Sequence, residues 1–209
     1  MTDEQGATES EHHPGQEVLS KEHRPILASH TVCMGFHHIA LATRDTEATH
    51  HFYTDVMDFE LVKVVASPTP GDSGGWSKHF FYDTGDGPMI AFWEIHDPDI
   101  GEDFPTDINA AAGLPWWVNH VAFDAPTRAA LDEHRRRWTD HGHTVIEVDH
   151  DFCTSIYIRD PSQNLVEFCL TTRDFTEEER RGAQALLRDP SPEFESEKGV
   201  VIHQPTGPA

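Results

Sequence analysis

Two histidines stand at matching places in two similar segments of this chain of 209 residues. His38 opens the run HIAL, and His120 opens the run HVAF. Both runs predict β-strands, in which alternate side chains face opposite sides of a sheet. Each histidine then shares its face with a small alanine two residues further on, and the larger apolar side chains face the other way. This arrangement leaves open space beside each imidazole.

A third polar residue, Glu167, has the same parity in the run NLVEFCL, where Val166 and Phe168 form the apolar face. A carboxylate in the middle of a buried strand costs free energy unless a positive group meets it. Two neutral imidazoles and one carboxylate with open positions opposite are typical of non-haem Fe(II) oxygen chemistry. Taken singly, the histidines are explained as hydrogen-bonded core residues and Glu167 as an exposed edge residue. The matching positions of all three favour a metal site.

An internal repeat surrounds these residues and predicts the fold. Residues 36–65 and 118–149 each follow the order strand, turn, helix, strand, because a β-rich run meets a turn signal and then a segment of helical period. Two further strands follow in each copy, at 78–84 and 88–95 in the first and at 154–160 and 164–170 in the second. We therefore expect an α+β protein built from two tandem βαβββ modules.

The two modules occupy about residues 34–97 and 116–173, within a domain that spans residues 31–173. Residues 1–30 are polar and acidic with little periodicity, which is typical of a flexible arm. In the segment 174–209, Thr176 and Glu179 have the spacing of a capping box. This segment is expected to form one short helix followed by a loose tail.

Composition excludes several classes of partner. The formal net charge is −22, from 15 basic and 37 acidic residues, so nucleic acid and anionic membranes are not expected to bind. This charge hints at an uncharged substrate. No run of about 18 apolar residues is present, the first residues lack the order of a signal peptide, and the three cysteines form no CxxC motif. We expect a reduced, cytoplasmic protein.

Residues 34–172 resemble the vicinal oxygen chelate superfamily, which includes glyoxalase I, fosfomycin and bleomycin resistance proteins, and type I extradiol dioxygenases. The resemblance implies a cupped, barrel-like mixed sheet around a metal held by His38, His120 and Glu167. A fourth ligand position falls at or near Ala91, which cannot bind metal, and Glu94 has the wrong parity. An empty fourth position matches the extradiol branch. The metal implied is Fe(II), with Mn(II) as the alternative.

The segment VDHDFCTSIYIRDPSQNLVE resembles the extradiol signature more specifically. All slots but one are filled, by His150, Ile156, Tyr157, Asp160, Pro161 and Glu167. Gln163 stands where the family has glycine or proline, which affects the turn if this residue or Asn164 cannot take the required backbone angles. By resemblance, His150 would assist proton transfer or steady bound oxygen, and Tyr157 would hydrogen-bond the substrate hydroxyl. The alternatives are a polar strand-edge histidine and a core tyrosine.

The larger extradiol enzymes carry a further catalytic histidine in a hairpin where this chain has GDGP, and His79 could replace it or face outward from its strand. Five aromatic residues could form walls for a planar ring or be ordinary core or dimer contacts: Trp76, Phe80, Trp93, Trp116 and Trp117. The function expected is extradiol cleavage of a catechol with O2, in a homodimer or higher homo-oligomer. The alternatives are a glyoxalase-like isomerase or lyase and a resistance-type small-molecule binding protein.

Overall fold

The computed structural model describes residues 35–85, 87–194 and 199–208 of the chain. The arm expected at residues 1–30 lies outside the described residues. The two βαβββ modules and the C-terminal segment all belong to the unit that begins at Gly35.

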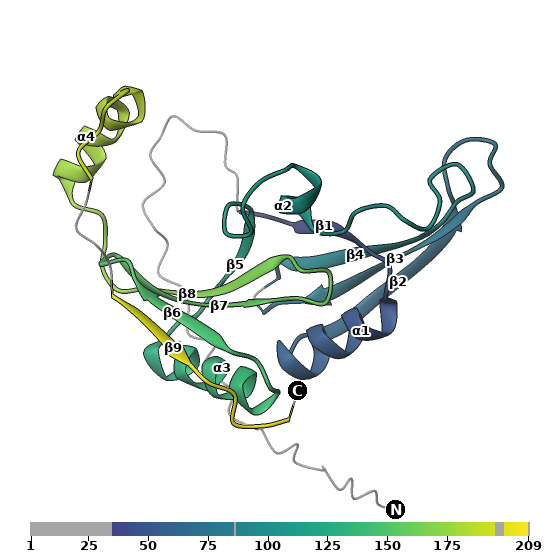
Figure 1. The fold of residues 1–209 in the computed structure, drawn as a ribbon, viewed down its shortest axis with the longest axis horizontal. Coiled ribbons are helices and arrows are strands. Elements are labelled where there is room, and N and C mark those ends of the chain that lie inside the picture. The colour runs from purple at the N-terminus through teal and green to yellow at the C-terminus, as the bar shows by residue number, and fades with distance from the viewer. Residues whose placement is uncertain (1–34, 86, 195–198, 209) are drawn as a thin grey trace, which may run out of the picture. The chain divides into compact units, whose positions relative to one another are not determined.

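The first module is a mixed four-stranded sheet with one helix. Its elements are β1 (His38–Thr43), α1 (Thr46–His51) with a π-helical continuation (Phe52–Val56), β2 (Glu60–Pro68), β3 (Trp76–Asp83) and β4 (Met89–His96). The strand order is β1-β4-β3-β2, in which β1 runs parallel to β4 and the other neighbours are antiparallel. Asp45 caps α1 because its carboxylate accepts the backbone N–H of Ala48 at 2.9 Å. Figure 1 shows α1 against one face of this sheet.

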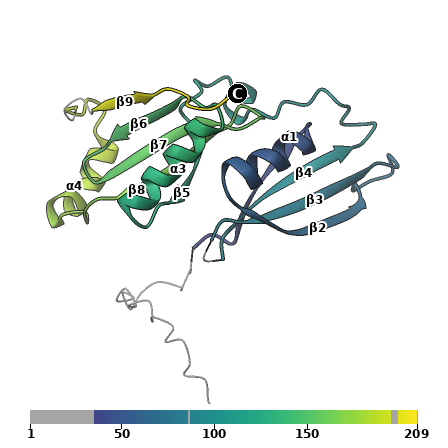
Figure 2. The same ribbon diagram turned by 90° about the horizontal axis from the view of Figure 1, so that it is seen from below.

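The second module repeats this order and adds one strand. After the short α2 (Ile108–Ala111), its elements are β5 (His120–Asp124), α3 (Arg128–Asp140), β6 (Val145–Asp149), β7 (Cys153–Arg159), β8 (Leu165–Thr171), α4 (Glu177–Arg188) and β9 (Val200–His203). The strand order is β5-β8-β7-β6-β9, with β5 parallel to β8. Helix α3 covers one face of the sheet (Figure 2).

The two sheets are separate, so the barrel-like closure expected from the sequence is not formed. Closure would require hydrogen bonds that join the two sheets, and in the described chain β1 pairs only with β4 while β5 pairs only with β8. The α+β class and the tandem βαβββ order are confirmed.

Strand register shows which positions of the two modules are equivalent. His38 lies opposite Met89 and Ala40 opposite Ala91. In the second module His120 lies opposite Leu165 and Ala122 opposite Glu167. Ala91 is therefore the first-module counterpart of Glu167, and a side chain that cannot bind metal stands at the position that carries a carboxylate in the second module.

The apolar faces of both modules belong to one core. Ile39, Leu41 and Phe123 are partly buried against this core, as the alternation of side chains predicted. The ring of Phe59 lies 5.0 Å from that of Phe123, and the buried Tyr53 donates its hydroxyl to Asp160 at 3.1 Å. Both contacts join residues of the first module to residues of the second.

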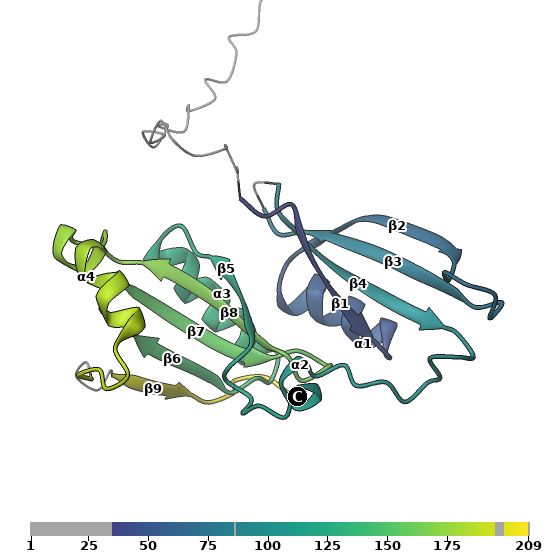
Figure 3. The same cartoon turned by 90° about the horizontal axis from the view of Figure 1, so that it is seen from above.

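The C-terminal segment departs from the loose tail expected after the helix. Helix α4 begins with the predicted capping box of Thr176 and Glu179. Val200–His203, however, form β9, which pairs antiparallel with β6 (Figure 3). Three of these four residues are β-branched, which suits a strand, and they pair with the edge of β6, which lies far away in the sequence. His203 fixes the strand by contacting Glu147 at 2.8 Å.

The chain after β9 is also held in place. Thr206 donates its backbone N–H to the carbonyl of Thr139 at 2.9 Å. A Cβ atom at Gly207 would lie 1.7 Å from the carbonyl oxygen of Asp140, so only glycine fits there. Within the described residues, no helix has the length and apolar character needed to span a membrane.

Candidate metal centre and ligand cavity

Strands β5 and β8 bring two of the predicted metal ligands together. Nε2 of His120 lies 3.3 Å from Oε2 of Glu167, and the Glu167 side chain is only 6% exposed whereas that of His120 is 40% exposed. The two residues share a face because the parallel register places Ala122, two residues after His120, opposite Glu167. A nearly buried carboxylate thus has an imidazole as its neighbour.

The protonation of His120 is constrained by its other ring nitrogen. Nδ1 lies 3.2 Å from the backbone carbonyl oxygen of Val118. A carbonyl oxygen only accepts hydrogen bonds, so Nδ1 carries the proton, and in a neutral ring Nε2 presents its lone pair. Backbone carbonyls often orient metal-binding histidines in this way.

The contact between His120 and Glu167 then joins two electron-pair donors unless a positive group lies between them. A proton on Nε2 would make an ion pair, and a divalent cation would bind both atoms. Ligands about 2.1 Å from one ion and at about 90–110° to each other are about 3.0–3.4 Å apart, which includes the observed separation. The donor set of one imidazole and one carboxylate therefore fits a metal ion.

His38 lies on the corresponding face of the first module. Its ring centroid is 5.6 Å from that of Phe81 and 6.1 Å from that of His79, and its Nδ1 is 2.8 Å from Nδ1 of His37. Among the described residues of one chain, no three His, Cys, Asp or Glu side chains form a group that could hold a metal. The structure thus brings together His120 and Glu167 but does not add His38, whose role as a third ligand stays a prediction.

The two predicted catalytic residues of the second module are in contact. Nε2 of His150 lies 3.1 Å from the hydroxyl oxygen of Tyr157. Burial raises the pKa of Tyr157, a hydrogen bond from Ser155 lowers it, and the neighbouring Glu167 raises it, with a net upward shift. The phenol therefore keeps its proton at neutral pH. Tyr157 lies opposite Glu167 across β7 and β8, which places this pair beside one of the predicted metal ligands.

A cavity of about 300 Å³ connects these groups. It is lined by Trp116, Trp117, His120, Ile146, Val148, His150, Tyr157 and Leu165. The volume is at the lower end of the range of small-molecule sites, and apolar walls with a few polar groups are typical of such sites. Of the five aromatic residues considered from the sequence, Trp116 and Trp117 line this cavity. A second lobe of about 330 Å³ shares four of its residues, and Arg159, which the sequence analysis did not select, lines it.

The other aromatic candidates lie elsewhere in the first module. Phe80 is a core residue at 3% exposure, and Trp76 stacks on His96 with centroids 4.0 Å apart. Trp93 stacks on His79 with centroids 3.8 Å apart. Burial lowers the pKa of His79, and nearby His38 lowers it further. Nε2 of His79 is buried and has no hydrogen-bond partner within the described residues, so its catalytic role remains a prediction.

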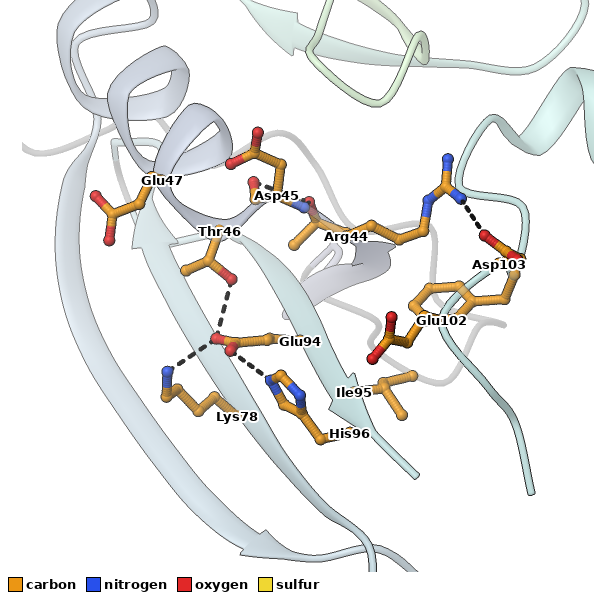
Figure 4. Close-up of a pocket in the computed structure, with 12 residues that line it drawn as sticks. Arg44, Asp45, Thr46, Glu47, Lys78, Glu94, Ile95, His96, Glu102 and Asp103 are labelled. Carbon is orange, nitrogen blue, oxygen red and sulfur yellow. Dashed lines mark hydrogen bonds and ion pairs between the residues drawn. The ribbon is translucent and has the colours of Figure 1, made fainter. Parts of the chain in front are cut away.

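A larger cavity of about 650 Å³ lies between the first module and the segment that follows it, and is lined mostly by charged and polar side chains (Figure 4). There Glu94 accepts hydrogen bonds from Thr46 and Lys78 at 2.9 Å and contacts Nε2 of His96 at 2.7 Å. Burial raises the pKa of Glu94, but these three contacts outweigh it and the pKa is lowered. The carboxylate of Glu94 is therefore held on the opposite face of the sheet from His38, as the alternation of side chains along the strand predicted. The predicted catalytic pair of His150 and Tyr157 lines the smaller cavity and not this one.

The turn between β7 and β8 accommodates its departure from the extradiol signature. Gln163 adopts a positive φ of 69°, the conformation that glycine takes most easily. Asp160 holds the turn by accepting the backbone N–H of Asn164 at 2.8 Å. Glutamine at the position where the signature has glycine or proline therefore leaves the turn intact, with backbone strain at this one residue.

Of three similar solved structures, the first supports the fold, with a TM-score of 0.50. A glyoxylase/bleomycin resistance protein/dioxygenase domain from Frankia sp. EAN1pec is 19% identical, with a TM-score of 0.50, over 67% of this chain and 99% of that one. A lactoylglutathione lyase from Agrobacterium tumefaciens is 25% identical, with a TM-score of 0.43, over 66% and 95% of the two chains. A fosfomycin resistance protein from Listeria monocytogenes is 22% identical, with a TM-score of 0.46, over 71% and 99%.

No curated protein matches the chain. The family model for the Glyoxalase/Bleomycin resistance protein/Dioxygenase superfamily matches residues 35–168, which include the first module from Gly35 onward, the second module up to the middle of β8, and the residues of the candidate centre. The paired βαβββ order and the equivalent strand registers agree with this match. The chain therefore belongs to the glyoxalase/bleomycin resistance protein/dioxygenase superfamily.

Proposed function

We propose that this protein is an extradiol dioxygenase that cleaves the ring of a catechol. The observation that carries the proposal is the contact between His150 and Tyr157 at 3.1 Å, in the cavity that His120 also lines. A proton-transfer pair beside a ligand of a candidate metal centre suits a substrate with ionisable hydroxyls. Ala91, at the counterpart of Glu167, supports the same choice, because glyoxalase-like isomerases usually carry a ligand there.

His120 and Glu167 would hold the metal, with His38 as the third protein ligand. The proposal requires His38 to reach the pair, either by a rearrangement of the two modules or from a second copy of the chain. A divalent ion held there, Fe(II) or Mn(II), would supply the Lewis-acid and redox chemistry that ring cleavage with O2 requires.

The chain's own residues orient the substrate and move its proton. The neutral phenol of Tyr157 donates to or accepts from a substrate hydroxyl held near Glu167, and His150 is placed to take up or return a proton through it. Trp116 and Trp117 offer flat apolar surfaces for an aromatic ring. Ile146, Val148 and Leu165 complete the apolar part of the cavity wall.

The proposal is tested by loading the protein with Fe(II) or Mn(II) without oxygen, adding 3-methylcatechol or 2,3-dihydroxybiphenyl, and then admitting air. We expect a yellow ring-opened product that forms in proportion to the oxygen consumed. A metal-loaded protein that consumes no oxygen with either compound would contradict the proposal. Tight binding of the catechol without oxygen uptake would instead favour a resistance-type binding protein.

A pair of matched variants separates the site from general effects on folding. Tyr157→Phe removes the phenol that faces the cavity, and Tyr82→Phe makes the same change at a buried residue of β3 whose hydroxyl contacts His50 at 3.0 Å. We expect Tyr157→Phe to lower turnover by about 100-fold, in the range of general acid–base contributions. Tyr82→Phe should retain turnover at the wild-type level.

A further inference from the structure

The second lobe of the ligand cavity is lined by hydrogen-bond donors and by no carboxylate. Its residues are Trp116, His143, Thr144, Ile146, Tyr157, Ile158, Arg159 and Leu165. An arginine, a histidine and a threonine line this wall and no acidic residue does, although the chain has 37 acidic residues against 15 basic ones. Arg159 and Trp116 only donate hydrogen bonds, whereas His143, Thr144 and Tyr157 both donate and accept, so this wall suits a ligand group that is rich in acceptor atoms.

Arg159 is the cation of this lobe. Its guanidinium carbon lies 5.0 Å from the ring centroid of Trp116, and its Nη1 is 3.5 Å from Oε1 of Gln163. No ion pair joins it to a carboxylate among the described residues. Arg136, Arg137 and Arg173 each pair with at least one acidic side chain. Arg159 therefore keeps its charge available beside the cavity.

Strand register fixes the position of Arg159 relative to the candidate metal centre. Arg159 lies opposite Leu165 on β8, and Leu165 lies opposite His120 on β5. Adjacent strands are about 4.8 Å apart, so the backbones at Arg159 and His120 are about 10 Å apart in one row across the sheet. Tyr157, two residues before Arg159, shares its face. A ring held by His120 and Tyr157 would thus point a short substituent toward the guanidinium.

We propose that Arg159 determines specificity for an aromatic substrate whose side chain ends in a carboxylate. The proposal rests on the proposed function, since it places a catechol ring in the first lobe and its acidic side chain in the second. A guanidinium matches a carboxylate with two parallel hydrogen bonds, and Trp116 holds its plane in position. This proposal replaces the uncharged substrate that the net charge of −22 suggested. The net charge of the whole protein slows the approach of an anion, whereas the guanidinium of Arg159 acts on the anion once it is in the cavity.

The experiment is anaerobic titration calorimetry of the full chain, with and without Fe(II). The probes are 3-(2,3-dihydroxyphenyl)propionate and 3,4-dihydroxyphenylacetate, each compared with a neutral catechol of similar size, 3-propylcatechol and 4-ethylcatechol. In the wild-type protein we expect at least one acid to bind about tenfold more tightly than its neutral counterpart, as for a charge-assisted hydrogen bond. Arg159→Met should abolish this preference and leave the affinity for the neutral catechols unchanged.

Two further variants serve as controls. Arg188→Met makes the same change in the last turn of α4, outside the residues that line either lobe, and should retain the preference. Arg159→Lys keeps the charge without the planar fork and should retain only part of it. The proposal is overturned if the wild type binds acid and neutral catechols equally or not at all, or if Arg159→Met keeps the preference. A preference for the acid without oxygen uptake would refute the proposed function alone.

Discussion

Asp160 provides the most quantitative test of how the two modules are joined. Its side chain is buried, with the residue 2% exposed, and it accepts the hydroxyl of Tyr53 at 3.1 Å and the backbone N–H of Asn164 at 2.8 Å. Burial raises its pKa from 3.8 to about 6, despite these hydrogen bonds, which lower it. The folded protein therefore holds a proton on Asp160 between pH 4 and pH 6 that the unfolded chain releases.

The sign of the pH effect follows from this difference. Because the folded state binds more protons in this window, the contribution of Asp160 to the free energy of unfolding is largest below pH 4 and falls as the pH rises through 6. A shift of about two pH units corresponds to at most about 3 kcal/mol. Asp160→Asn removes the charge, accepts the N–H of Asn164 through its amide oxygen, and donates to the Tyr53 oxygen through its amide nitrogen.

The assay is urea unfolding of the wild type and of Asp160→Asn at several values between pH 4 and pH 7.5. We expect the variant to gain stability relative to the wild type as the pH rises, by up to about 3 kcal/mol at neutral pH. Tyr53→Phe removes a hydrogen bond that lowers the pKa of Asp160. The free energy of unfolding of this variant should therefore depend more strongly on pH than that of the wild type. If the difference in free energy of unfolding between Asp160→Asn and the wild type stays constant with pH, the raised pKa of Asp160 is refuted.

Three other predictions concern the turn, the catalytic pair and the C-terminal strand. Gln163→Gly should raise the free energy of unfolding by about 1 kcal/mol, because it relieves the positive φ; an unchanged denaturation midpoint would contradict this. His150→Gln should lower oxygen uptake with 3-methylcatechol about 100-fold and leave iron content unchanged, which metal analysis of the same sample checks. Gly207→Ala places a Cβ against the carbonyl of Asp140, so hydrogen exchange should show loss of protection in β9; retained protection would mean that the tail is held without this contact.

The sequence was sufficient for those features that depend on local periodicity. Alternation of side chains placed His120 and Glu167 on one face, and the register confirms that face for both. The capping box at Thr176 was found for the same reason, because its two hydrogen bonds join residues three apart. His150 and Tyr157 were each selected through a family signature whose spacing this chain retains, but their contact with each other was not predicted.

Features that depend on long-range pairing were missed. Strand β9 forms because four residues near the C-terminus pair with the edge of β6, and their own sequence does not indicate which strand they pair with. Arg159 was not selected because it stands just before a turn, where an arginine is usually solvated. Its parity with Tyr157 was the signal that would have placed it on the cavity face. The separation of the two sheets could not be read from the repeat, because equal modules fit open and closed arrangements alike.

The measurement that tests the account most directly is the binding of Fe(II), under anaerobic conditions, to the wild-type chain and to Glu167→Ala. The wild type should bind one iron per chain, and Glu167→Ala should bind none at the same free Fe(II) concentration, since the carboxylate 3.3 Å from His120 supplies a ligand. Glu94→Ala, which removes a partly buried carboxylate of the first module, should bind iron as the wild type does. Equal iron content in Glu167→Ala and the wild type would contradict the account.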